Sequence, residues 1–262
     1  MSAPAVGTTA HLDLAGAKGI PFWRLLAVEM RKAVDTRATR WLLVAMLGLS
    51  AAIMVGMALK APDEFRKFST LWKMGMQIVA LLLPVVGILA TTSEWKHRSA
   101  LTTFALEPRR IRVFLAKMFV VLGLALAATL LGLVMAALAT VIAGTAATDK
   151  TGLWTFETKS IALYTVFMLI NVLVGFALGM LLSNSAIAIT VYYIAPVVTP
   201  LIALWDKAKP VMDWVSQTAL ATPFQMDTAT NEQWQQSAVA ALVWIVTPLI
   251  IGGWLGYRRE VK

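Results

Sequence analysis

Long stretches without charged residues alternate along this chain with short stretches that carry nearly all of its Lys, Arg, Asp and Glu. Each uncharged stretch is long enough for a helix, rising about 1.5 Å per residue, to cross a hydrocarbon core about 30 Å thick. We therefore predict an all-α integral membrane protein whose residues 22–262 form a single membrane domain. Its six transmembrane helices should lie at about residues 41–59, 74–93, 118–144, 160–182, 186–205 and 235–257.

The first part of the chain has a different pattern. Residues 1–21 have no apolar run, and we expect a disordered cytoplasmic tail. In residues 22–40 an apolar stripe follows the 3.6-residue helical period and continues to Trp41, while charged residues occupy the other faces. Its members are Trp23, Leu26, Met30, Val34 and Trp41. This pattern is typical of an N-terminal amphipathic helix in the plane of the lipid head groups; the alternative, a helix on a soluble core, lacks such a core.

Composition supports the membrane assignment. Hydrophobic residues make up 59% of the chain and charged residues 14%, whereas soluble domains have about 25% charged residues. The chain has no cysteine and only two histidines, so we expect no disulfide and no metal site. The net charge of +9 would favour nucleic acid in a soluble protein. Here the basic residues flank the spans, which favours membrane lipid and no nucleic acid as the partner.

The distribution of basic residues also predicts orientation. Lys and Arg gather in the N-terminal region, in residues 94–117 and at the C-terminus, and are sparser in the three loops on the other side. Cytoplasmic loops carry the excess of basic residues in membrane proteins. We therefore expect both termini and the 94–117 loop to be cytoplasmic. Tryptophans near span ends, such as Trp41, Trp72 and Trp254, suit the interfacial belts.

Several kinds of chemistry have no motif in this sequence. There is no GxxxxGK[ST] phosphate loop, no HExxH and no GxSxG. The predicted spans contain no Asp, Glu, Lys, Arg or His, although ion-coupled transporters usually keep such a residue at mid-membrane. The pattern argues against a secondary transporter and an intramembrane hydrolase. We expect a chain that is not an enzyme and has no cofactor of its own.

The stretch from Glu94 to Lys117, EWKHRSALTTFALEPRRIRVFLAK, is a polar island between two spans. It resembles the first cytoplasmic loop of type II ATP-binding-cassette exporter permeases. The resemblance rests on Glu94, His97, Thr102, Thr103, Pro108, Arg110 and Lys117. Arg98 and Ser99 stand where the family usually has a Gly-Thr pair. The order of an amphipathic helix, a span, an outer loop, a span and a basic loop is also similar.

The resemblance implies a bacterial plasma-membrane subunit that pairs with a second permease copy, identical or not. It also implies a separate ATPase partner, which would hold the ATP and Mg. In that family a coupling helix in this loop contacts the ATPase. The corresponding residues here would be Glu94, Trp95, His97, Arg98, Ser99, Thr102 and Phe104. Glu94 would act as a hinge or pairing residue.

Other residues have alternative interpretations. We interpret Arg109, Arg110, Arg112 and Lys117 as positive-inside anchors that bind lipid phosphate. By resemblance, spans two and five would line the path between copies for a hydrophobic or amphipathic cargo. The path candidates are Met76, Gln77, Tyr192, Tyr193 and Thr199, with ordinary packing as the alternative.

Two small motifs predict helix contacts. Gly175 and Gly179 form a GxxxG on the fourth span, where we expect packing within the chain rather than between copies. Asn171 could donate or accept a hydrogen bond across helices. The rival to an exporter subunit, besides a secondary transporter, is a membrane scaffold or assembly factor that transports nothing.

Overall fold

The computed structural model describes residues 20–96, 109–226 and 228–258, and every regular element in that part of the chain is helical. The predicted tail therefore lies almost entirely outside the described residues. In chain order the elements are α1 (Phe22–Asp35), α2 (Arg37–Lys60), a short 3-10 turn (Asp63–Phe65), α3 (Phe68–Lys96), α5 (Arg110–Ala146), α6 (Thr158–Leu182), α7 (Ser185–Ile202), α8 (Lys209–Val215), α9 (Gln217–Gln225), α10 (Asn231–Ala241), a π-helical turn (Leu242–Val246) and α11 (Thr247–Arg258).

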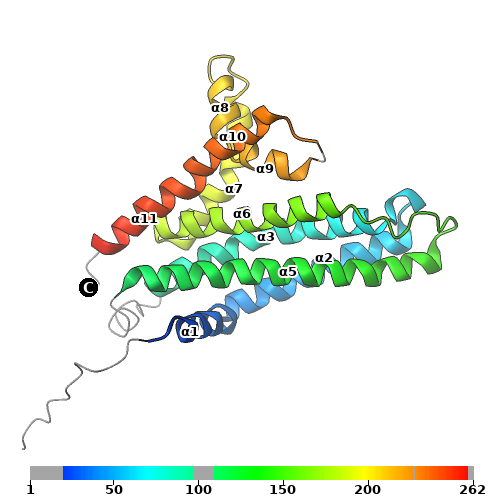
Figure 1. Cartoon of the computed structure of the whole chain (residues 1–262), viewed down its shortest axis with the longest axis horizontal. Helices are drawn as coiled ribbons and strands as arrows, with labels where there is room; N and C mark the ends of the chain where they lie inside the picture. Colours follow the sequence, from blue (N-terminus) through cyan, green and yellow to red (C-terminus); the bar gives the residue numbers. More distant parts are fainter. Residues whose placement is uncertain (1–19, 97–108, 227, 259–262) are drawn as a thin grey trace, which may run out of the picture.

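Six helices in the described part of the chain are long and apolar enough to cross a membrane. The sequence prediction of an all-helical, multi-pass membrane protein is confirmed at that level. These helices are α2, α3, α5, α6, α7 and the rod formed by α10, the π-helical turn and α11. The rod and α7 rise away from the other helices and carry α8 and α9 near their tip (Figure 1).

The helix ends differ from the predicted span limits. Helix α3 begins at Phe68 and continues to Lys96, and α5 begins at Arg110, so much of the predicted 94–117 loop is helical. A helix satisfies its own backbone hydrogen bonds and can therefore extend past its apolar stretch into a polar zone. The amphipathic segment also ends earlier than predicted. Thr36 interrupts it, and its hydroxyl caps α2 by accepting from the Thr39 amide.

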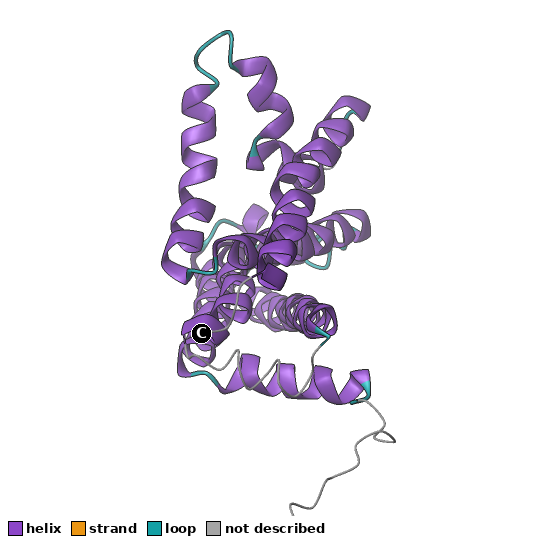
Figure 2. Cartoon of the chain, turned by 90° about the vertical axis from the view of Figure 1, so that its left-hand side faces the viewer, coloured by secondary structure: helices purple, strands orange, loops and turns teal. Residues whose placement is uncertain are grey.

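Helices α2, α3, α5 and α6 lie side by side with their long axes roughly parallel (Figures 1 and 2). Helix α1, the start of α5, the turn between α6 and α7, and the end of α11 gather at one end of this bundle. We call this the α1 end. The turn there is the predicted one, with Ser183 in the left-handed region at φ 51° and Asn184 capping α7 through the Ile187 amide.

The closest helix contact is a glycine seam between α3 and α6, formed by Gly87, Gly175 and Gly179. A Cβ at Gly175 would lie 2.2 Å from the Pro84 carbonyl oxygen, and one at Gly87 would lie 2.5 Å from that of Val172. Only glycine fits at such a backbone approach. The GxxxG motif therefore packs within the chain, as predicted.

The main core lies between these helices and includes Trp72, which is completely buried. Its ring meets Tyr164 edge-on, with the centroids 5.4 Å apart. The prediction of an interfacial Trp72 is therefore wrong. Helices α3 and α6 pack so closely that this ring lies between them rather than on the surface. Trp41 and Trp254, in contrast, are exposed.

At the end opposite α1, the Arg66–Asp63 ion pair of the loop after α2 also binds the backbone at the end of α5. The Arg66 guanidinium donates to the Asp63 carboxylate at 2.7 Å and to the carbonyls of Leu59 and Ala146 at 3.2 and 2.7 Å. Those carbonyls lie in the last turns of α2 and α5, where a cation meets the negative end of each helix dipole. Asp63 in turn accepts from the amides of Thr148 and Asp149.

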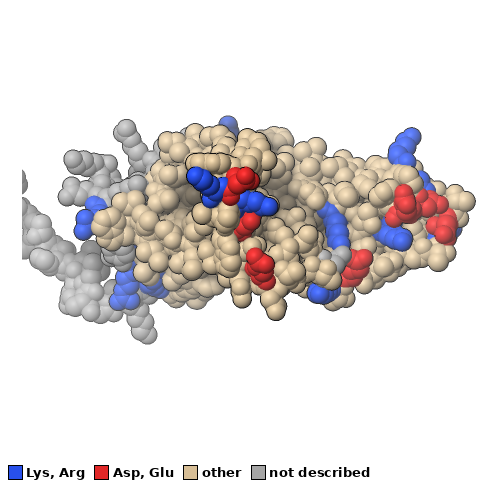
Figure 3. Space-filling model, turned by 90° about the horizontal axis from the view of Figure 1, so that it is seen from above, with Lys and Arg blue, Asp and Glu red and all other residues tan. Residues whose placement is uncertain are grey.

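Charged side chains form patches rather than an even coat. The view from the side of the α8 to α10 tip shows Lys and Arg at the α1 end. Charges of both signs lie on the tip and toward the end opposite α1, with uncharged surface between these groups (Figure 3). A surface of this kind is expected where lipid rather than water is the solvent.

Candidate functional site

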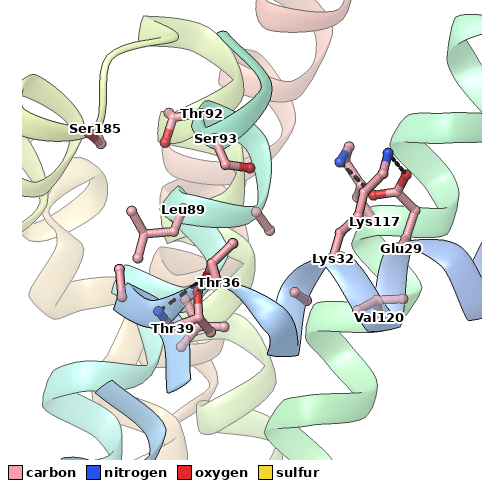
Figure 4. Close-up of a pocket in the computed structure, with 14 residues that line it drawn as sticks. Glu29, Lys32, Thr36, Thr39, Leu89, Thr92, Ser93, Lys117, Val120 and Ser185 are labelled. Carbon is pink, nitrogen blue, oxygen red and sulfur yellow. Dashed lines mark hydrogen bonds and ion pairs between the residues drawn. The ribbon is translucent and has the colours of Figure 1, made fainter. Parts of the chain in front are cut away.

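A buried ion pair connects α1 to α5 at the α1 end. The Lys117 ammonium donates to the Glu29 carboxylate at 2.6 Å, and the two side chains are only 4% and 2% exposed. Lys32, one turn along α1, donates to the other carboxylate oxygen at 2.8 Å and is 41% exposed. Figure 4 shows both ammonium groups pointing at Glu29. We call these three residues the α1 cluster.

The local sequence explains how the α1 cluster forms. Leu25 and Glu29 are four residues apart and lie on the same face of α1. Leu25 packs on Val113 and Ala116, which precede Lys117 on the matching face of α5. The apolar contact therefore brings the two helices together, and the ion pair neutralises the charges that this contact buries. Without a partner, either charge would be costly to bury.

Most of the apolar stripe predicted for α1 faces away from the bundle, and only Leu26 is partly buried. Trp23 is 65% exposed, and Met30 and Val34 are also exposed, whereas Leu25 and Glu29 are buried. The side of α1 that contacts the bundle is therefore apolar apart from Glu29, and Phe22 and Leu26 pack beside Leu25 there. This leaves the exposed apolar side chains available to lipid, as the prediction of a helix in the head-group plane requires.

A small cavity of about 80 Å³ with a mixed polar and apolar lining lies beside the α1 cluster. Hydroxyl groups from α2, α3 and α7 complete its lining, including those of Thr39, Thr92, Ser93 and Ser185. Figure 4 shows Thr92 and Ser93 on α3, which together with the α1 cluster line this cavity. Ser93 directly precedes Glu94, so the cavity connects α1 and α5 to the residues that lead into the predicted coupling segment.

Most of that segment is outside the described part of the chain. Residues 97–108, which contain His97, Arg98, Ser99, Thr102 and Phe104, are not described. Glu94 and Trp95 belong to the last turn of α3, and the structure describes only their backbone. The predicted coupling role of these residues stays a prediction.

The predicted lipid anchors occupy different environments. Arg109 is exposed at the start of α5. Arg110 donates to the Gly256 carbonyl of α11, and Arg112 donates to the Ile20 carbonyl at 2.7 Å. Lys117 is buried against Glu29, so its position does not suit lipid binding, and we reassign it to the contact between α1 and α5. Sequence reasoning missed Glu29, although it is one of the two acidic residues of α1 and lies four residues after Leu25.

The path candidates do not gather in one place. Met76 is buried in the core beside Gly132, whereas its neighbour Gln77 is exposed. The Tyr192 hydroxyl donates to the Asn171 side chain at 2.7 Å, which joins α7 to α6 as expected for Asn171. Tyr193 donates to the Leu81 carbonyl of α3.

Thr199, on the second half of α7, is partly buried, and its hydroxyl has no hydrogen-bond partner among the described residues. Of the five path candidates, Tyr192 and Tyr193 therefore join α7 to neighbouring helices. A role in a substrate path stays a prediction for the whole set.

No group of three or more His, Asp or Glu that could hold a metal ion occurs in the part of the chain that the structure describes. Comparison of the chain with protein-family models, with curated proteins and with solved structures found no match.

Proposed function

We propose that this chain is the permease subunit of an ATP-driven exporter of the type II ATP-binding-cassette class, in a bacterial plasma membrane. The proposal rests chiefly on the meeting of α1, the end of α3 and the start of α5 around the buried Glu29–Lys117 pair. The stretch that resembles the family's coupling loop joins those same two helices, α3 and α5.

This arrangement supports a coupling mechanism. A displacement of residues 97–104 by a bound ATPase would enter α3 at Lys96 and α5 at Arg110. Because Glu29 and Lys117 join α1 to α5, α1 would move with α5. The glycine seam between α3 and α6 would carry the same displacement to α6. Coupling of this kind requires contiguous packed elements, and the bundle supplies them.

The energy source would lie on the partner. The chain has no phosphate loop, so ATP and Mg would be held by a separate ATPase subunit. A second permease copy would complete the path for a hydrophobic or amphipathic cargo. Helix α7 supports this part of the proposal because its outer side exposes Ile194, Val197 and Leu201 to a partner or to lipid.

Co-purification and coupled activity test the proposal together. Tagged full-length protein should retain an ATPase whose activity depends on cargo. Glu94→Ala, or deletion of residues 97–104, should abolish ATP-dependent export. Glu64→Ala, which removes an exposed acid at the opposite end, is the matched control and should leave export unchanged.

Two outcomes would overturn the proposal. The first is a purified complex that contains no ATPase, with export intact after deletion of residues 97–104. The second is a set of bound assembly partners without any transported cargo, which would favour the scaffold function instead. A reporter fused after Arg98 checks the orientation and should give a cytoplasmic signal.

A further inference from the structure

An apolar groove runs between α5 and α11 at the α1 end and has a volume of about 390 Å³. Helix α6 packs against both helices and closes the groove at the back. Its two walls are formed by Ile111, Phe114 and Leu115 of α5 and by Ile250, Gly253 and Trp254 of α11. Its volume lies in the range of about 300–1,000 Å³ that is typical of small-molecule sites.

The groove opens outward, toward the surroundings of the bundle. Ile250 is 66% exposed and Ile111 57% exposed, so both walls have apolar edges on the surface. Along α5 the lining extends from Ile111 to Met118, which is about 10 Å at 1.5 Å per residue. That depth fits within one leaflet, which is about half of a 30 Å hydrocarbon core.

Basic side chains border the groove at its α1 end. The Arg258 guanidinium lies 4.1 Å from the centroid of the Trp254 ring, which forms part of the wall. Arg110 directly precedes Ile111 and donates to the Gly256 carbonyl, so it bridges α5 and α11 at the same end. Among the described residues, none that lines the groove is acidic. Basic pockets between transmembrane helices bind anionic lipid head groups.

We propose that this groove binds one phospholipid with a net negative head group. One acyl chain lies along the apolar walls, and the phosphate lies against Arg258, with the positive charge of Arg110 nearby. Trp254 suits this position, because its ring can contact the lipid acyl chain on one side and the Arg258 guanidinium on the other. The site does not depend on the proposed export function, because its ligand is a component of the bilayer.

Native mass spectrometry of the full-length protein tests the proposal. The protein is purified in detergent and then given equal amounts of phosphatidylglycerol and phosphatidylcholine with the same acyl chains. The wild-type protein should retain one phosphatidylglycerol in preference to phosphatidylcholine. Arg258→Gln should reduce that preference roughly fivefold, the factor for one basic side chain at an anionic surface. Because Arg258 is exposed, this variant should fold normally.

A second variant fills the groove. A Cβ at Gly253 would meet only the flexible end of Met180, at 3.3 Å. Gly253→Leu should therefore fold and should lower the occupancy of both lipids. Gly56→Leu is the matched control, because nothing lies within 4 Å of a Cβ there. Arg24→Gln is the control for charge, since Arg24 also lies over a tryptophan, Trp23, at 5.5 Å but is on α1, away from the lining of this groove.

Three results would overturn the proposal. If Gly253→Leu retains as much phosphatidylglycerol as Gly56→Leu, the lipid does not occupy the groove. If Arg24→Gln reduces the lipid preference as much as Arg258→Gln, the selectivity comes from general surface charge. Equal retention of both lipids by the wild-type protein would likewise refute the head-group assignment.

Discussion

Removal of either partner of the buried Glu29–Lys117 pair should release α1 from α5. The atoms are 2.6 Å apart, so their direct attraction is about 6 kcal/mol at an effective dielectric constant of about 20. Desolvation of both groups opposes most of it. Loss of one partner from a buried pair costs about 3–5 kcal/mol, because the other charge is left without compensation.

The two single variants should not be equivalent. Lys117→Met leaves Glu29 paired with Lys32, so its cost should lie near the lower limit of about 3 kcal/mol. Glu29→Gln removes the carboxylate that both Lys117 and Lys32 contact, so its cost should lie near the upper limit of about 5 kcal/mol. Glu157→Gln, in an exposed pair with Lys73, should cost less than about 1 kcal/mol.

Cysteine labelling measures the release of α1 directly. The chain has no cysteine of its own, so Ala116→Cys supplies the only thiol. Ala116 is completely buried under α1, and the thiol should react slowly in an otherwise unchanged protein. Because about 1.4 kcal/mol corresponds to tenfold in an equilibrium, Lys117→Met should accelerate labelling at least about a hundredfold, and Glu29→Gln more.

The double variant decides whether the reasoning is correct. Glu29→Gln with Lys117→Met removes both members of the buried pair, so it should label more slowly than Glu29→Gln alone. If the costs of the two single variants simply add, the double variant should label faster than either of them. That result would refute this account. So would two single variants that label no faster than Glu157→Gln.

Three further predictions concern the packing of the bundle. Gly175→Ala should lower the stability by about 1–3 kcal/mol through overpacking against Pro84. Gly123→Ala is the control, because the Cβ added there meets nothing within 4 Å. Equal melting temperatures for the two variants would contradict the close backbone contact at the glycine seam. Arg66→Gln should cost about 1.5–3 kcal/mol in thermal unfolding, because charged hydrogen bonds to two helix ends are lost. Tyr192→Phe should cost only about 0.6 kcal/mol in detergent denaturation, the average for a hydrogen bond between membrane helices; a loss several times larger would show that the hydroxyl does more than join α6 to α7.

The spans were predictable from the sequence because lipid leaves few alternatives. A backbone in hydrocarbon must satisfy its own hydrogen bonds, so an uncharged stretch of sufficient length predicts a helix. The turn at Ser183 and Asn184 was predictable for a similar reason, because short polar residues between two apolar stretches have local capping roles. The GxxxG motif correctly indicated close packing, since glycine leaves the helix backbone accessible.

The environment of single charged residues was not predictable in the same way. Lys117 follows three arginines and precedes a span, a context in which a basic residue usually contacts lipid phosphate. Its partner Glu29 lies 88 positions away in the sequence, and no local sequence pattern indicates that the two residues pair. Trp72 shows the same limit, because its distance from a span end does not reveal which neighbouring helix covers it.

The glycine seam has a consequence for stiffness. Side chains between two helices can change rotamer and allow sliding, but backbones in direct contact have no such adjustable layer. Gly87, Gly175 and Gly179 therefore make α3 and α6 one rigid body. Bending of this protein must occur at other joints. The π-helical turn at Leu242–Val246, where the backbone hydrogen-bond register changes between α10 and α11, offers such a joint.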